Sequence, residues 1–382
     1  MEGSVLRTPG LPLVLAMTFL SFSGYAALLP VAPLWVVHGG AGSVGAGMVN
    51  GVLMLVTVLT QLVIPTALRR FGWGPVLIAG TLLLGLPSAA FALSDALAPV
   101  LALSAVRGLG FGVVTVTGSA LVAELVEPER RGEAIGLYGL AIAAPQVLFV
   151  SAGPWLVETL GFALIFALGM LPALGMVPAM LLGGQAGPVH AAQERAPYSR
   201  LMQPILLLLA ATVAGGALIT FMAPMSDSAA LSTLALLCMM LATAVTRWQA
   251  GSWADRFGPH RFLAPLVLLS VAGMALMAWA VRDPLDTAVA SLLLGATLVG
   301  IGYGALQNLT LVLAFRSVTR SHYGSASALW NVGYDGGTGL GAVVIGVIAA
   351  GSSFSVALAI GGALCLATLP LALIRQAPAQ ED

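Results

Sequence analysis

Apolar segments of about 20 residues or more, the length that an α-helix needs to cross a lipid bilayer, follow one another along this 382-residue chain. The segments that join them are mostly very short, and only 8% of the residues are charged, against about 25% in an average soluble domain. Such a chain cannot cover itself with a surface that water solvates. We therefore predict an all-α membrane protein with twelve transmembrane helices, at residues 11–37, 45–68, 73–93, 97–125, 132–157, 161–183, 201–224, 229–250, 261–281, 287–315, 322–350 and 353–376.

Similar short sequences recur half a chain apart. Pro-Thr-Ala-Leu-Arg-Arg-Phe-Gly at 65–72 matches Gly-Ser-Trp-Ala-Asp-Arg-Phe-Gly at 251–258, and Gly-Leu-Gly-Phe-Gly at 108–112 matches Gly-Ile-Gly-Tyr-Gly at 300–304. These offsets of 186 and 192 residues are close to half of the chain. In a membrane chain such a repeat is typical of transporters. We expect two pseudo-symmetric six-helix bundles, at 1–183 and 201–382, joined by a polar linker at 184–200.

The arginines indicate the orientation in the membrane. If the N-terminus lies inside, the inner segments hold twelve arginines and the outer segments only Arg282. The positive-inside rule then predicts that both termini are cytoplasmic. The first apolar run, 11–37, is longer than the core of a cleaved signal peptide, so we expect it to be a retained span.

Several function classes are excluded by composition. The net charge is zero, with no basic patch of the kind that binds nucleic acid. The two cysteines, Cys238 and Cys365, lie far apart in apolar runs and suit buried hydrophobic positions better than a metal site or a disulfide. The spans contain no nucleophile–base set and no phosphate-binding loop. We expect no enzyme activity, no cofactor and no metal.

One loop carries a family resemblance. The pattern Gly251-x-x-Ala254-Asp255-Arg256-x-Gly258-x-x-Arg261 resembles the signature loop of the major facilitator superfamily, whereas the first copy has Arg69 where that family has Asp. The resemblance implies a fold of two six-helix bundles. It also implies a cytoplasmic latch, made by Gly251, Asp255, Arg256, Gly258 and Arg261 and closing near Arg130 and Arg131. The alternative is a solvated turn whose charges only set the topology.

A second resemblance concerns Arg107-x-x-Gly110-x-Gly112, which is similar to the helix-4 signature of drug/proton antiporters in that superfamily. The helix-5 signature is present only in part, because Gly153-Pro154 is followed by Val157-Glu158 instead of paired glycines. This resemblance implies efflux coupled to protons.

Two charged residues lie deep in predicted spans. Arg107 is about ten residues into its span and Asp335 about thirteen into its own, where an unpaired charge costs about 3 kcal/mol or more. The repeat places Val299 and Ala143 at the equivalent positions, so the fold alone does not require the charges. Asp335 is a candidate proton carrier, a fixed counter-charge for Arg107 or a partner of nearby polar groups, or a substrate contact. The alternative for Arg107 is a structural role, bonded to helix-end carbonyls.

The family resemblance also implies that helices 1, 4, 7 and 10 line a central cavity. Aromatic and methionine side chains there favour an amphiphilic ligand over a sugar. These side chains could instead pack against lipid or the core, and the adjacent amides at 307 and 308 could bond neighbouring helices. The candidate substrate-binding residues are Phe22, Tyr25, Arg107, Thr220, Phe221, Met222, Tyr303, Gln307, Asn308, Asn331 and Asp335.

The sequence therefore predicts a secondary active transporter of a bacterial inner membrane. We expect it to export a small amphiphilic compound in exchange for protons by alternating access, as a monomer, with no nucleic-acid partner. The alternative is a facilitator or importer of a small metabolite or sugar with the same fold.

Overall fold

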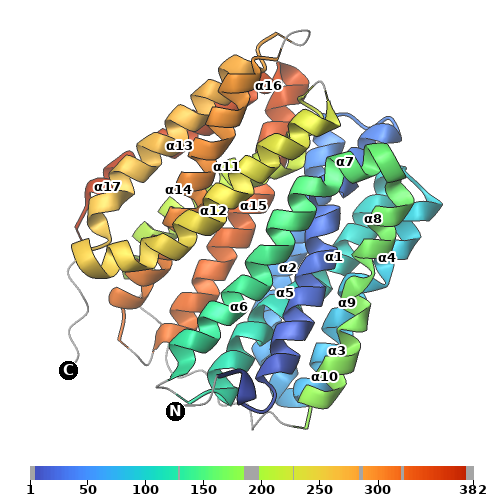
Figure 1. Cartoon of the computed structure of the whole chain (residues 1–382), viewed down its shortest axis with the longest axis vertical. Coiled ribbons are helices and arrows are strands. Elements are labelled where there is room, and N and C mark those ends of the chain that lie inside the picture. Colours follow the sequence, from blue (N-terminus) through green and yellow to red (C-terminus); the bar gives the residue numbers. More distant parts are fainter. Residues whose placement is uncertain are drawn as a thin grey trace. The chain divides into compact units, whose positions relative to one another are not determined.

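The computed structural model describes residues 5–127, 130–184, 198–226, 228–283, 287–319 and 322–375, and all regular secondary structure in them is helical (Figure 1). Twelve helical segments in this part of the chain are long and apolar enough to span a membrane, which confirms the predicted number. They run over Leu11–His38, Ser43–Phe71, Trp73–Leu93, Leu97–Val122, Glu133–Leu160, Phe162–Leu182, Tyr198–Phe221, Ala229–Ala254, His260–Ala280, Val289–Arg316, Ser325–Gly351 and Phe354–Leu373.

Several spans are made of more than one helical element. The elements up to the linker are η1 (Val5–Arg7), α1 (Leu11–His38), α2 (Ser43–Phe71), α3 (Trp73–Gly85), α4 (Pro87–Ala90), η2 (Phe91–Leu93), α5 (Leu97–Leu125), α6 (Arg131–Pro145), η4 (Gln146–Val150), α7 (Ser151–Leu160), α8 (Phe162–Gly169), α9 (Leu171–Leu174) and α10 (Met176–Leu182). After the linker come α11 (Tyr198–Phe221), α12 (Ala229–Phe257), α13 (His260–Ala280), α14 (Val289–Arg316), α15 (Tyr323–Gly351), α16 (Phe354–Leu366) and α17 (Leu369–Leu373).

Proline lies at two of these interruptions. The fifth span turns from α6 into a single π-helical turn, Gln146–Val150, directly after Pro145. Proline lacks the N–H that would continue the α-helical ladder, and neighbouring helices compensate for the loss in a membrane bundle. The third span breaks in the same way at Pro87, where α3 gives way to α4. The break leaves the last carbonyls of α3 without their ordinary helical partners.

The chain divides into two compact units. Unit 1 holds residues 1–39 and 52–190, and unit 2 holds residues 40–51 and 191–382. Most of the predicted linker, 185–197, lies outside the described residues. The assignment of 40–51 to unit 2 has a structural basis, because Asn50 Nδ2 donates a hydrogen bond to Thr220 Oγ1 at 2.9 Å.

Equivalent contacts appear inside the two units at the offsets of the sequence repeat. In unit 1, Thr57 Oγ1 of α2 donates to the Gly108 carbonyl of α5 at 3.2 Å. In unit 2, Thr243 Oγ1 of α12 donates to the Gly300 carbonyl of α14 at 3.2 Å. A β-carbon on Gly108 or on Gly300 would collide with the backbone of the facing helix. The repeat thus preserves a close helix contact together with its cross-helix hydrogen bond.

Glycines also set the distance between α11 and α15 in unit 2. A β-carbon at Gly216, Gly337 or Gly341 would meet backbone atoms of the facing helix, whereas one at Gly336 would meet nothing within 4 Å. Small residues that allow backbones to approach are a principal means of helix association in lipid. At the first three positions glycine therefore permits a close approach of the two helices.

Candidate functional site

Arg107 of α5 is the largest fully buried side chain in the described part of the chain, with 1% of its surface exposed. Its Nε donates to the Leu84 carbonyl at 3.3 Å, and Nη2 donates to the Gly24 carbonyl of α1 at 3.2 Å. Leu84 lies in the last turn of α3, where carbonyls lack helical partners and a positive charge is favoured. The guanidinium carbon lies 5.9 Å from the centre of the Phe91 ring. Arg107 therefore ties α1 and the end of α3 to α5, and one of its two acceptors is a helix-end carbonyl, as in the structural alternative.

Three aromatic rings lie beside this arginine within unit 1. Tyr25 and Phe111 stack with centroids 3.9 Å apart and planes 7° apart. Phe22 meets both rings edge-on, at 5.9 Å from Tyr25 and 5.5 Å from Phe111. Phe111 did not appear among the sequence candidates, although it follows Arg107 by four residues and so shares its helix face. The predicted residues Phe22, Tyr25 and Arg107 thus belong to one cluster.

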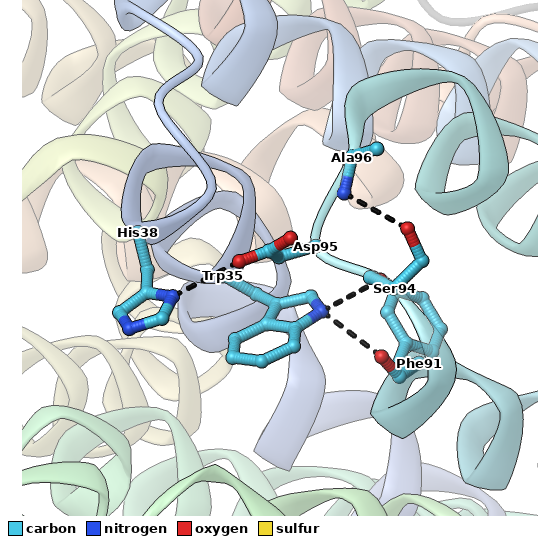
Figure 2. A network of polar contacts seen from close by, with 6 residues as sticks. All are labelled: Trp35, His38, Phe91, Ser94, Asp95 and Ala96. Carbon is cyan, nitrogen blue, oxygen red and sulfur yellow. Dashed lines mark hydrogen bonds and ion pairs between the residues drawn. The ribbon is translucent and has the colours of Figure 1, made fainter.

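A polar network lies at the end of α1 in unit 1 (Figure 2). The Trp35 indole N–H points at two carbonyls, Phe91 O and Ser94 O, each at 3.0 Å. One turn later, His38 Nδ1 lies 3.2 Å from Asp95 Oδ2, and the His38 ring stacks on Trp35 at 5.2 Å. These contacts fix the loop before α5 against α1. No motif in the sequence indicates this network.

In unit 2, aromatic residues of α14 and α15 form a second cluster. Tyr303 Oη and Tyr334 Oη lie 2.8 Å apart, and Trp330 Nε1 donates to Thr310 Oγ1 at 3.1 Å. Trp330 and Tyr334 are one helical turn apart, and their rings stack with centroids at 5.6 Å and planes 21° apart. We call this pair of stacked rings, Trp330 and Tyr334, the aromatic wall of α15.

Gln307 lies on α14 between the two contacts with that wall. It follows Tyr303 by four residues and precedes Thr310 by three, so all three occupy one stripe of the helix. Gln307 is 1% exposed, yet its Nε2 has no hydrogen-bond partner within the described residues. A buried amide donor without a partner is costly, by about 1–3 kcal/mol. Gln307 therefore offers a buried donor that no described residue uses.

The side-chain amide of the next residue, Asn308, has a hydrogen-bond partner in the protein. Asn308 Nδ2 donates to the Arg247 carbonyl of α12 at 3.1 Å, so this side chain bonds a neighbouring helix, as one alternative expected. Arg247 itself lies within the span Ala229–Ala254 and is partly buried. Arg247 is not among the sequence candidates, although an arginine inside an apolar run is itself a signal of function. The predicted residue Asn331 donates to the Ser327 carbonyl of its own helix at 3.0 Å.

Asp335 lies near the middle of α15 and is 2% exposed. It follows Tyr334 directly in the sequence. The second predicted deep charge is thus buried within its own unit, beside the aromatic wall. The candidates at the end of α11 and directly after it are already engaged in unit 2. Thr220 accepts from Asn50, the ring centroids of Phe221 and Phe354 lie 5.5 Å apart, and Met222 is fully buried.

The latch residues can be placed only in part. Gly258 has φ +79° and Gly72, its repeat equivalent, has φ +76°, conformations that favour glycine, so both loops turn tightly at these residues. Arg256 and Arg261 are exposed, and a β-carbon at Gly251 would touch the Asn308 amide at 3.7 Å. Arg130 lies 3.6 Å from Glu133. The side chains of Asp255 and Arg131 lie outside the described part of the structure.

Comparison with known proteins gives one family and several structural neighbours. The model of the Major Facilitator Superfamily matches residues 14–280 and 205–382. No protein with a curated function matches the sequence.

Three solved structures resemble almost the whole chain. A bacterial homologue of the human lysosomal transporter Spinster, in an inward-facing and occupied conformation, is 14% identical with a TM-score of 0.72, covering 97% of this chain and 96% of that one. The nucleoside transporter NupG is 12% identical with a TM-score of 0.71, covering 95% and 99%. An auto-inhibited POT family peptide transporter is 12% identical with a TM-score of 0.73, covering 98% of each chain. At these identities the likeness shows the fold alone.

Proposed function

Because this chain belongs to the major facilitator superfamily of membrane transporters, we propose that it exports a small amphiphilic compound in exchange for protons. The antiporter signature at Arg107 supports this assignment to the drug/proton branch. We place the protein in a bacterial inner membrane with both termini cytoplasmic, as a monomer. Its moving halves would be residues 1–183 and 201–382, with the loop at 251–261 as a latch.

One observation supports the proposed coupling of transport to protons. Asp335 is a carboxylate 2% exposed in the middle of a transmembrane helix, at a position where the repeat has Ala143. A buried carboxylate favours its neutral form, and a path to water restores its charge. A group that alternates between these states can carry a proton when the protein changes the side to which it opens.

The chemistry of the unit 2 cluster supports the ligand class. Trp330 and Tyr334 of α15 offer a flat apolar surface, and Gln307 of α14 offers a buried N–H donor between the two α14 residues that contact these rings. An aromatic wall with a single directed donor suits a planar or apolar molecule that carries one acceptor group. A sugar would need many more polar partners.

The test begins with a thermal-shift screen of the detergent-purified protein against drugs, sugars and metabolites. The compound that stabilises most is then followed in proteoliposomes, with and without an imposed proton gradient. Wild-type protein should move it against its gradient only when protons flow the other way. Asp335→Asn should abolish this gradient-driven transport and retain the exchange of labelled for unlabelled compound.

The matched control is Gly336→Ala, since a β-carbon there meets nothing within 4 Å and changes the same turn of α15. It should transport as wild type does. Transport by wild-type protein that ignores the proton gradient would refute the coupling and favour the facilitator alternative. Loss of exchange together with gradient-driven transport in Asp335→Asn would mean that Asp335 binds the substrate or holds the fold.

A further inference from the structure

The end of α1 lies directly against the loop that leads into α5 (Figure 2). A β-carbon on Gly39 would collide with the Asp95 carbonyl oxygen, so the two backbones approach closely. The preceding residue, His38, has its Nδ1 3.2 Å from Asp95 Oδ2. One turn earlier, the Trp35 indole N–H donates to two carbonyls of the segment before Asp95. One ion pair and two hydrogen bonds therefore attach the loop to α1.

The ion pair is the part of this attachment that depends on pH. An indole N–H and a backbone carbonyl do not titrate, whereas histidine is the side chain that changes its charge between about pH 8 and pH 5. A protonated His38 presents a cation to the Asp95 carboxylate, and a hydrogen bond between charged groups is stronger than one between neutral groups. The two side chains are 59% and 38% exposed, so protons in the surrounding water can reach the pair.

Within the described part of unit 1, Asp95 is the one charged group that forms an ion pair with His38. The helix α8 presents the uncharged Phe162 ring to His38, with centroids 5.5 Å apart, and the other stacked neighbour is Trp35. The helix α7 carries Glu158 four residues before Phe162, and this carboxylate is exposed and not paired with His38. Asp95 is therefore the counter-charge that a protonated His38 would meet.

The attached loop leads into the helix that carries Arg107. The helix α5 begins at Leu97, two residues after Asp95. Phe91, whose carbonyl accepts from Trp35, also has its ring centre 5.9 Å from the Arg107 guanidinium carbon. Attachment of the loop to α1 therefore restrains the start of α5 together with a ring that lies against Arg107.

We propose that His38 and Asp95 form a pH-sensitive clamp, which fastens the loop before α5 to the end of α1 when His38 is protonated. Under the proposed orientation this end of unit 1 faces outside, so the clamp responds to external acidity. It does not depend on proton exchange at Asp335, which is buried in unit 2. Exposed ion pairs contribute little, so protonation should shift the opening of the loop by a factor of about five at most.

The experiment measures backbone hydrogen exchange of the full-length purified protein at about pH 8 and about pH 5.5, with rates corrected for the pH dependence of chemical exchange. The reporters are two loop amides, because the Ser94 N–H donates to the Phe91 carbonyl and the Ala96 N–H to the Ser94 hydroxyl. In wild-type protein their protection should rise about two- to fivefold at the lower pH. Salt at about 1 M should remove most of this rise, because it screens exposed charges.

Three variants of the pair separate charge from packing. His38→Gln and Asp95→Asn each remove one of the two charges and should show no rise in protection at the lower pH. His38→Lys carries a positive charge at both pH values and should protect the loop at both. The matched control is Glu158→Gln, which removes a nearby carboxylate outside the pair and should respond as wild type does.

A wild-type protein without the rise would overturn the clamp. So would a rise that persists in His38→Gln, because another group would then be titrating. An equal loss of the rise in Glu158→Gln would also overturn it, since that would indicate a general charge effect. Exchange in α11 of unit 2 should be the same in every variant, which verifies that each one is folded.

Discussion

At the scale of single residues, the partners of a buried polar group decide what that group contributes. Arg107 is buried and uses its guanidinium to donate to two carbonyls from different helices. Those carbonyls would be left without that donor if the side chain were apolar, and each such loss costs about 1–3 kcal/mol. The role of Arg107 in transport therefore has to be separated from its role in holding α1 and α3.

We expect Arg107→Met to lower the unfolding free energy by about 2 kcal/mol or more. Arg107→Lys should lower it by less, because lysine keeps a positive charge and some hydrogen-bond donors. Thermal unfolding in detergent measures both. Leu109→Met is the control, since Leu109 is on the same helix and 41% exposed. If Arg107→Met were as stable as wild type, the two hydrogen bonds would contribute nothing.

Gln307 and Asn308 provide a second contrast between adjacent residues of the same chemistry. Gln307→Met should leave stability unchanged or raise it slightly, since the amide donor has no described protein partner, and should weaken ligand binding about three- to tenfold. Asn308→Leu should instead lower stability by about 1 kcal/mol, because it removes the bond to the Arg247 carbonyl. Thermal unfolding with and without the best ligand measures both effects. The reverse pattern would contradict the assignment of Gln307 to the ligand.

At the scale of helices, close approach between backbones is what the glycines provide. Gly341 and Gly336 both lie in α15, but only Gly341 has the α11 backbone where a β-carbon would stand. A glycine in α15 is therefore required for close packing at position 341 and is not required for it at position 336. Rotation of the helix about its axis decides which one applies.

Gly341→Ala should lower the unfolding free energy by about 1–3 kcal/mol, because the helices must separate to make room. Gly336→Ala should be neutral or stabilising by up to about 1 kcal/mol, as alanine favours a helix more than glycine does. Chemical unfolding of the two variants beside wild type measures the difference. Equal stability of the two variants would show that α15 can shift without cost.

At the scale of the whole molecule, the internal repeat recurs as equivalent physical contacts. Thr57 and Thr243 each bond the carbonyl of a glycine in the helix that packs against them, one in each unit. Arg107 and Asp335 have no such equivalence, because Val299 and Ala143 stand at the matching positions. What the repeat preserves is packing, whereas the charged residues differ between the units.

Thr57→Val and Thr243→Val should therefore destabilise by similar amounts, about 0.5–1.5 kcal/mol each, since each removes one cross-helix hydrogen bond. The two sites lie in separate units and share no partner. The loss of unfolding free energy in the double variant should therefore equal the sum of the losses in the two single variants. Unfolding of the single and double variants in one detergent tests this. If the double variant were no less stable than either single variant, the two units would not contribute independently to the stability of the protein.

Much of the fold followed from local chemistry. In hydrocarbon every backbone group must be satisfied within its own helix, so an apolar run of sufficient length predicts a span wherever it occurs. Twelve such runs, the glycine turns at 72 and 258 and the break after Pro145 were accordingly predictable from residues that lie together in the chain. The grouping of 40–51 with unit 2 was not, since its bonds reach residues about 170 to 300 positions away.

The sequence by itself determined the number of spans, their lengths and the repeat, because these depend on hydropathy and on local backbone geometry. Only the tertiary structure decided that Arg107 donates to carbonyls of α1 and α3, and that Asn308 is engaged while Gln307 keeps a donor without a described partner. Each of these outcomes depends on which face of a helix meets which neighbour. That is set by the packing of segments distant in sequence, which no local pattern encodes.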